Sequence, residues 1–236
     1  MLYLISIGLY DEKDMSLRAL EMAKKCDSLY VEFYTNRAAT DAGRLSGLIG
    51  KPVKELKRHG LEGGSGSLLD EARNNDVGVL VPGDALTATT HVSLLLDAKN
   101  KGVKSEIVHG SSIVSAVGET GLQVYKFGRT TTLTDPVQAS TINAIESNRK
   151  SGLHTLVLLD IGMTASHGLG LLKDYVKGDV AVACSMGGNG GIIYDDIKSL
   201  MEENMELAPA VIIIPGELHF MEKEYLETMR PHSANP

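Results

Sequence analysis

The stretch Gly78-Val-Leu-Val-Pro-Gly-Asp-Ala-Leu-Thr-Ala-Thr-Thr-His91 organises our interpretation of the fold. It begins with a short β-branched apolar run, which predicts a buried strand, and then turns at Pro82-Gly83-Asp84 toward a helix. In open α/β sheets small ligands bind at the carboxyl ends of strands, and a glycine there leaves the backbone accessible. Asp84 therefore either caps the helix that follows or presents a fixed charge to a ligand.

The residues around this stretch repeat the order of strand, loop and helix. Leu2 to Ile7 is a nearly continuous apolar run, as expected of a central strand covered on both faces. Met15 to Cys26 carries its apolar residues on one helical stripe. Further strands are expected at 28–34, 77–81 and 104–108, and further helices at 40–49, 68–74 and 87–100. This alternation predicts an α/β domain.

A second strand exit follows at His109-Gly110-Ser111-Ser112-Ile113, where small and polar residues lead into a short helix. It is a second candidate ligand edge, although a serine there is equally explained as a helix cap. Residues 123–128 and 130–133 alternate like a strand with a kink at Gly128.

The remaining residues predict a second sheet. Strongly apolar strands are expected at 155–159, 179–184 and 210–214, and helices at 137–151, 168–176 and 192–204. We therefore expect two α/β domains, 1–133 and 134–236. The glycine-rich segments 63–66 and 186–191 are interpreted as connections, because neither has the spacing of a phosphate-binding or dinucleotide-binding loop.

Composition and motifs exclude several classes of protein. Among 236 residues, 43% are hydrophobic and 22% charged, as in ordinary globular proteins, and the formal net charge of -7 disfavours a general nucleic-acid surface. Cys26 and Cys184 are expected to be buried thiols, and no zinc-site spacing occurs. GxGxxG and GxSxG are absent. The apolar N-terminus has no preceding basic residue, so we expect neither a signal peptide nor a membrane span. We therefore expect a cytoplasmic protein.

Several blocks of the sequence, taken together and in order, form a recognisable combination. The blocks are Ile7-Gly-Leu-Tyr-Asp-Glu-Lys-Asp14, Ala23-Lys-Lys-Cys-Asp27, Val31-Glu-Phe-Tyr-Thr35, Pro82-Gly-Asp84 with Ala88-Thr-Thr-His91, Ser112-Ile-Val-Ser-Ala-Val-Gly118, Thr120-Gly-Leu122, Tyr125-Lys-Phe-Gly128 and Pro215-Gly-Glu-Leu-His219. Together they resemble the diphthine synthases, a group of tetrapyrrole methylase-like methyltransferases. The resemblance covers most of the chain and is densest before residue 133.

The resemblance implies a homodimer whose two domains hold S-adenosylmethionine in a cleft between them. It implies N-methylation, up to a trimethylated product, of the 3-amino-3-carboxypropyl arm on a modified histidine of translation elongation factor 2, a step of diphthamide biosynthesis. From the charge and the N-terminal sequence we expect no membrane or nucleic-acid partner. The implied cofactor contacts are Leu9, Asp84, Thr87, Ser112, Ile113, Leu159, Met186 and Val211.

Methyl transfer from a sulfonium mainly requires that the donor carbon be held close to an amine and in line with the departing sulfur. No metal or covalent nucleophile is expected. A base must deprotonate the amine, and the sequence does not identify it: His91 and His219 are candidates, but a helix-borne histidine is more often packed or exposed. We expect Asp84 to face the positively charged cofactor. The alternatives are a methyltransferase of the same fold acting on a tetrapyrrole precursor or RNA, and a cofactor-binding protein without catalysis.

Overall fold

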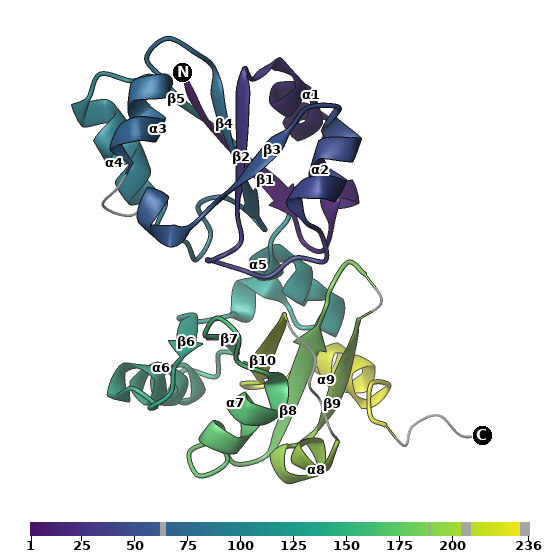
Figure 1. The fold of residues 1–236 in the computed structure, drawn as a ribbon. Helices are drawn as coiled ribbons and strands as arrows, with labels where there is room; N and C mark the ends of the chain where they lie inside the picture. The colour runs from purple at the N-terminus through teal and green to yellow at the C-terminus, as the bar shows by residue number, and fades with distance from the viewer. Residues whose placement is uncertain (62–64, 189, 204–208, 232–236) are drawn as a thin grey trace. The chain divides into compact units, whose positions relative to one another are not determined.

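The computed structural model describes residues 1–61, 65–188, 190–203 and 209–231 (Figure 1). The chain forms two compact units, Met1–Val114 and Ser115–Pro236. Two α/β units were expected, but their division lies earlier than the boundary placed after residue 133. The boundary is corrected because strand β6 (Thr131–Leu133) pairs with β7 (Thr155–Leu159) and so belongs to the second sheet.

The first unit contains a parallel sheet of order β3-β2-β4-β1-β5, flanked by helices. Its strands are β1 (Leu2–Gly8), β2 (Ser28–Glu32), β3 (Val53–Leu56), β4 (Val77–Pro82) and β5 (Ser105–Val108). Its helices are η1 (Glu12–Asp14), α1 (Leu17–Lys25), α2 (Ala42–Ile49), η2 (Arg58–Gly60), α3 (Gly66–Glu71) and α4 (Val92–Asn100), and α5 (Ile113–Ala116) lies at the division.

Two apolar cores cover the two faces of this sheet, because successive side chains of a strand point to opposite sides. Leu2 and Leu4 of β1 pack with the helices α3 and α4, whereas Ile5 and Ile7 pack with α1 and α2. The helix pairs accordingly lie on opposite sides of the first sheet in Figure 1. The continuous apolar run at the N-terminus is thus explained by burial on both faces, as expected.

The second unit contains a mixed sheet of order β6-β7-β10-β8-β9. The pairs β7–β10, β10–β8 and β8–β9 are antiparallel, whereas β6 runs parallel to β7. Besides β6 and β7, its strands are β8 (Asp179–Cys184), β9 (Gly191–Asp196) and β10 (Ala210–Ile214). Its helices are η3 (Val117–Thr120), η4 (Val124–Lys126), α6 (Ala139–Lys150), α7 (Ala165–Leu172), α8 (Ile197–Glu202) and α9 (Phe220–Glu227).

Several sequence-based boundaries were wrong. The helix expected at 192–204 is the strand β9 followed by α8, because the Gly191–Asp196 segment pairs along its whole length with β8. The strand expected at 123–128 is the 3-10 turn η4, and the helix expected from Thr87 begins only at Val92. The connection at 186–191 is described except for residue 189, and the one at 63–66 mostly lies outside the described residues. Both cysteines are buried free thiols, as expected.

Candidate functional site

Three neighbouring strands of the first unit end side by side. The order β4-β1-β5 is parallel, so the carboxyl ends of these strands lie at one edge of the sheet. The peptides of Gly8 and Gly83 exchange two hydrogen bonds there, with N to O distances of 3.2 and 2.7 Å. Both glycines have positive φ, 106° and 72°, which a residue with a Cβ adopts only under strain. Glycine is therefore required where these two strands turn out of the sheet.

The side chain of Asp84 connects the turn after β4 to the residues that follow β5. Its Oδ1 accepts hydrogen bonds from Leu86 N (3.0 Å) and Thr87 Oγ1 (3.2 Å), and its Oδ2 accepts them from His109 Nδ1 (2.8 Å) and Gly110 N (3.2 Å). Burial of the carboxyl raises its pKa, but these bonds outweigh burial, and the pKa lies below its usual value. Asp84 is therefore ionised at neutral pH. It does not cap α4, whose N-cap residue is His91.

The third exit is packed against the first. Gly110 lies so close to β1 that an added Cβ would stand 2.7 Å from the Cβ of Ser6. The hydroxyl of Ser6 accepts a hydrogen bond from Ala85 N at 3.0 Å, from the turn after β4. The exits of β1, β4 and β5 are thus joined directly by backbone contacts and by the side chains of Ser6 and Asp84.

The five contacts expected from the first unit all follow these exits. Leu9 follows β1, Asp84 and Thr87 follow β4, and Ser112 and Ile113 follow β5. Except for Asp84, which is buried, their side chains are half-buried. The structure therefore brings together, at one sheet edge, residues as far apart in sequence as Leu9 and Ile113.

The three contacts expected from the second unit also share one edge, that of the second sheet. Leu159 ends β7, and Val211 lies at the start of the antiparallel β10, opposite Leu158. Met186 follows β8, whose last residue Cys184 pairs with Ala210. Leu159 is half-buried and the other two residues are buried.

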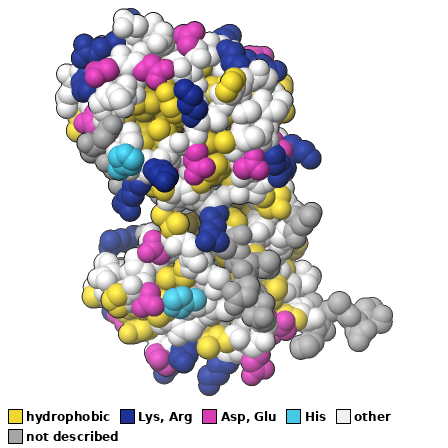
Figure 2. Space-filling view, in the orientation of Figure 1, with side chains coloured by type: hydrophobic (Ala, Val, Ile, Leu, Met, Phe, Trp, Pro, Cys, Tyr) yellow, Lys and Arg dark blue, Asp and Glu magenta, His cyan; other side chains and the backbone are white. Residues whose placement is uncertain are grey.

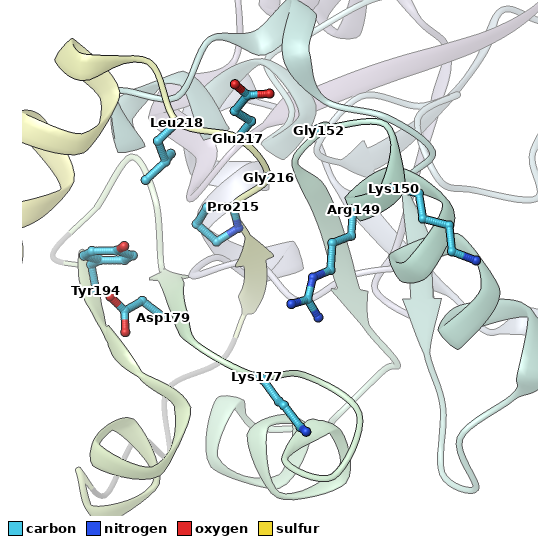
Figure 3. Close-up of a pocket in the computed structure, with 10 residues that line it drawn as sticks. All are labelled: Arg149, Lys150, Gly152, Lys177, Asp179, Tyr194, Pro215, Gly216, Glu217 and Leu218. Carbon is cyan, nitrogen blue, oxygen red and sulfur yellow. The ribbon is translucent and has the colours of Figure 1, made fainter.

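A surface hollow of about 460 Å³ lies at the opposite edge of the second sheet (Figure 3). It adjoins the start of β8 and the end of β10. Its lining residues are Arg149, Lys150, Gly152, Lys177, Asp179, Tyr194, Pro215, Gly216, Glu217 and Leu218. None of the expected cofactor contacts lines this hollow. The hollow is therefore separate from the sheet edge at which Leu159, Met186 and Val211 lie.

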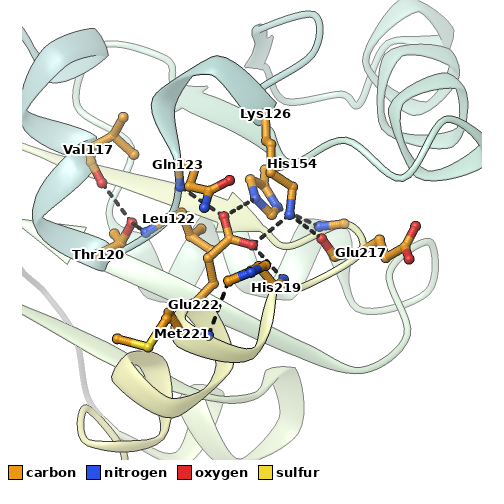
Figure 4. Close-up of polar contacts among 11 residues, drawn as sticks. Val117, Thr120, Leu122, Gln123, Lys126, His154, Glu217, His219, Met221 and Glu222 are labelled. Atoms are coloured by element: carbon orange, nitrogen blue, oxygen red, sulfur yellow. Dashed lines mark hydrogen bonds and ion pairs between the residues drawn. The ribbon is translucent and has the colours of Figure 1, made fainter.

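A buried polar network fixes the turn between β10 and α9 (Figure 4). The carboxylate of Glu222 accepts hydrogen bonds from Lys126 Nζ (2.6 Å), Gln123 N (2.9 Å), His219 N (2.7 Å) and His154 Nε2 (3.1 Å). Gly216 N donates to His154 Nδ1 at 2.9 Å, so Nε2 carries the proton of a neutral imidazole. This network holds in place the Pro215–His219 segment, one of the blocks that carried the resemblance.

The structure distinguishes the histidines that could act as bases. His91 is only 1% exposed, and its Nδ1 donates to Ala85 O, so it is part of the core of the first unit. His219 is the N-cap of α9, and its Nδ1 accepts from Met221 N. Sequence reasoning passed over His109, which is 67% exposed and bonded to Asp84. Its place directly after a strand was the available signal.

The linked exits fit a sulfonium donor that carries an amino acid and a nucleoside. Leu9 and Ile113 are half-buried apolar side chains suited to a flat base, and Thr87 and Ser112 bring hydroxyl groups to the same edge. The ionised Asp84 supplies negative charge beside them. The residues present are therefore compatible with S-adenosylmethionine.

Comparison with known proteins identifies the family of the chain. The family model of the tetrapyrrole (corrin/porphyrin) methylases matches residues 1–196. Diphthine synthases of Methanococcus maripaludis and Methanocaldococcus jannaschii are each 39% identical, over 96% of this chain and 98% of theirs. A crystal structure of diphthine synthase superposes with a TM-score of 0.91 at 34% identity, covering 97% of this chain and 95% of that one. Among the described residues, no helix combines the length and apolar character needed to cross a bilayer. The chain belongs to the tetrapyrrole methylase family and, within it, to the diphthine synthases.

Proposed function

We propose that this chain is an S-adenosylmethionine-dependent methyltransferase that N-methylates the 3-amino-3-carboxypropyl group on the modified histidine of translation elongation factor 2. The observation that carries the proposal is the joined exits of β1, β4 and β5, in a chain similar to diphthine synthases over 96% of its length. We further propose that it acts as a homodimer in the cytoplasm, and that the acceptor methylated is a protein and not a nucleic acid.

When bound, S-adenosylmethionine supplies a methyl group on a positively charged sulfur, which is a good leaving group. The chain's part is to bind and orient the reactants. We propose that Leu9, Thr87, Ser112 and Ile113 contact the donor. Asp84 acts beside them, since its charge favours a cation and its four hydrogen bonds fix the turn. For the second unit we propose contacts from Leu159, Met186 and Val211.

Acceptor specificity decides between this function and its alternatives. Elongation factor 2 carrying the modified arm is incubated with the chain and S-adenosylmethionine, and its intact mass is measured, with elongation factor 2 lacking the arm as the control. We expect the mass to rise by whole methyl groups only when the arm is present. The number of increments gives the number of methyl groups transferred.

Two further arms test the alternatives directly. A tetrapyrrole precursor and an RNA acceptor are offered in place of the protein, and formation of the demethylated donor is followed. On the face shown in Figure 2, basic and acidic side chains are interspersed, which does not favour RNA. Methylation of the tetrapyrrole or RNA without methylation of elongation factor 2 would refute the proposal. So would donor binding without turnover on any acceptor.

A further inference from the structure

We propose that His109 is the general base that removes the proton from the substrate amine, and that Asp84 is the residue that positions it. The inference rests on the proposed function and identifies the residue that performs its proton transfer. An amine is protonated in neutral water, and an ammonium ion has no lone pair with which to attack a methyl group. Each methyl transfer therefore needs one proton removed.

The contact between His109 and Asp84 fixes the tautomer of the imidazole. Nδ1 lies 2.8 Å from Asp84 Oδ2, and an ionised carboxylate can only accept a hydrogen bond. The proton of the neutral ring is therefore on Nδ1, and the lone pair is on Nε2. A carboxylate that orients a histidine in this way also stabilises the imidazolium formed after proton uptake.

Accessibility separates His109 from the buried histidines. His91 and His154 are almost fully buried, whereas the side chain of His109 is 67% exposed although Asp84 holds one of its nitrogens. The supporting carboxylate is itself only 9% exposed. The pair thus combines a fixed, buried acceptor with a reachable Nε2. Among the described residues, Asp84 is the charged group that contacts His109.

His109 lies on the connection that also carries two of the expected donor contacts, and the amine must meet the methyl group of that donor. His109 is the first residue after β5, and Gly110, which follows it, packs against β1 and donates to the same carboxylate. Ser112 and Ile113, two of the expected donor contacts, lie three and four residues further along. The base and these expected contacts therefore belong to one short connection.

The proton and electron balance of the step is complete without a further reagent. Nε2 of His109 takes one proton from the substrate ammonium. The freed nitrogen lone pair forms a bond to the methyl carbon while the electron pair of the carbon–sulfur bond goes to sulfur, which becomes a neutral thioether. Because His109 is exposed, its imidazolium returns the proton to water before the next transfer.

The variant His109→Gln tests the inference. Its side-chain amide can still donate to Asp84 but cannot take a proton. We expect kcat to fall about 100-fold or more, donor affinity measured by calorimetry to stay within about twofold, and the acidic limb of the pH–kcat profile to disappear. The matched control is His167→Gln, since His167 is also exposed and also paired with a carboxylate, Asp135 at 3.1 Å. It should leave every one of these measurements unchanged.

Two more measurements separate a base from a structural residue. Added imidazole should restore part of the activity of His109→Ala, which loss of folding or of donor contacts would not permit. Nitrogen-15 NMR of the unliganded wild type should show His109 as the Nδ1–H tautomer, and Asp84→Asn should abolish this preference. An active wild type with an equally active His109→Gln would overturn the inference, and so would a loss that imidazole does not restore. An inactive wild type on the armed elongation factor would instead refute the proposed function.

Discussion

Replacing Glu222 with glutamine should destabilise the second unit by about 3 kcal/mol at pH 7. The side chain is 1% exposed, and burial alone would raise its pKa, yet bonds from Lys126, the backbone and His154 lower the pKa from 4.5 to about 2. At about 1.4 kcal/mol per unit, that difference stabilises the folded state by about 3 kcal/mol. In Glu222→Gln the amide cannot accept all four hydrogen bonds, and two donors are left facing its NH₂ group.

The stabilisation that Glu222 provides should depend on pH. Because the folded pKa of Glu222 is depressed, its contribution is fully present above the unfolded value of 4.5 and is lost as pH falls toward 2. The difference in stability between wild type and Glu222→Gln should therefore be largest near neutrality and shrink below pH 4.5. Burial lowers the pKa of His154 below its usual value of 6.5 despite the opposing effect of Glu222, which favours the neutral imidazole beside this carboxylate.

Urea unfolding followed by far-ultraviolet circular dichroism measures the effect, since the chain has no tryptophan. A loss of about 3 kcal/mol in a unit of this size lowers Tm by roughly 10 °C. The control is Glu217→Gln, an exposed neighbour, for which we expect a change within about 0.5 kcal/mol. If Glu222→Gln lowers the free energy of unfolding by less than about 1 kcal/mol, or by an amount independent of pH, the network does not stabilise the ionised form of Glu222.

Two other predictions concern packing in both units. Gly110→Ala should lower the free energy of unfolding, measured in urea, by about 1–3 kcal/mol because its Cβ would meet Ser6. The control Gly47→Ala lies in the exposed interior of α2 with nothing within 4 Å and should raise this free energy by about 0.5–1 kcal/mol. Equal effects of the two substitutions would contradict the close approach of Gly110 to Ser6. Burial raises the pKa of Cys26 and Cys184 to about 11, so neither thiol should react with a disulfide reagent at pH 8 until urea unfolds the chain; rapid reaction in the native protein would show that a thiol is accessible.

Local pattern predicted the central strands and the exits that follow them. The runs at Leu2–Ile7, Thr155–Leu159 and Ala210–Ile214 are apolar enough to require burial, and each is a strand. In the first unit, the glycine and polar residues that follow β1, β4 and β5 marked the edge where the candidate contacts lie. Local pattern failed at Gly191–Asp196, because that segment becomes a strand through its pairing with β8. Local pattern also placed the boundary between the two units too late in the chain. The pairing of β6 with β7 is a long-range contact, and hydrophobic periodicity does not predict such contacts.

The sequence by itself determined the α/β class, the strand exits and the family resemblance, because each depends on residues close together in the chain. Only the tertiary structure decided which polar groups meet. Asp84 and His109 are separated by a whole helix and strand, and they touch because β4 and β5 flank β1 in one parallel sheet. Glu222 meets His154 and Lys126 in the same way, across the second unit. A side chain's charge and tautomer follow from its partners in space, and strand order, which spacing does not encode, determines those partners.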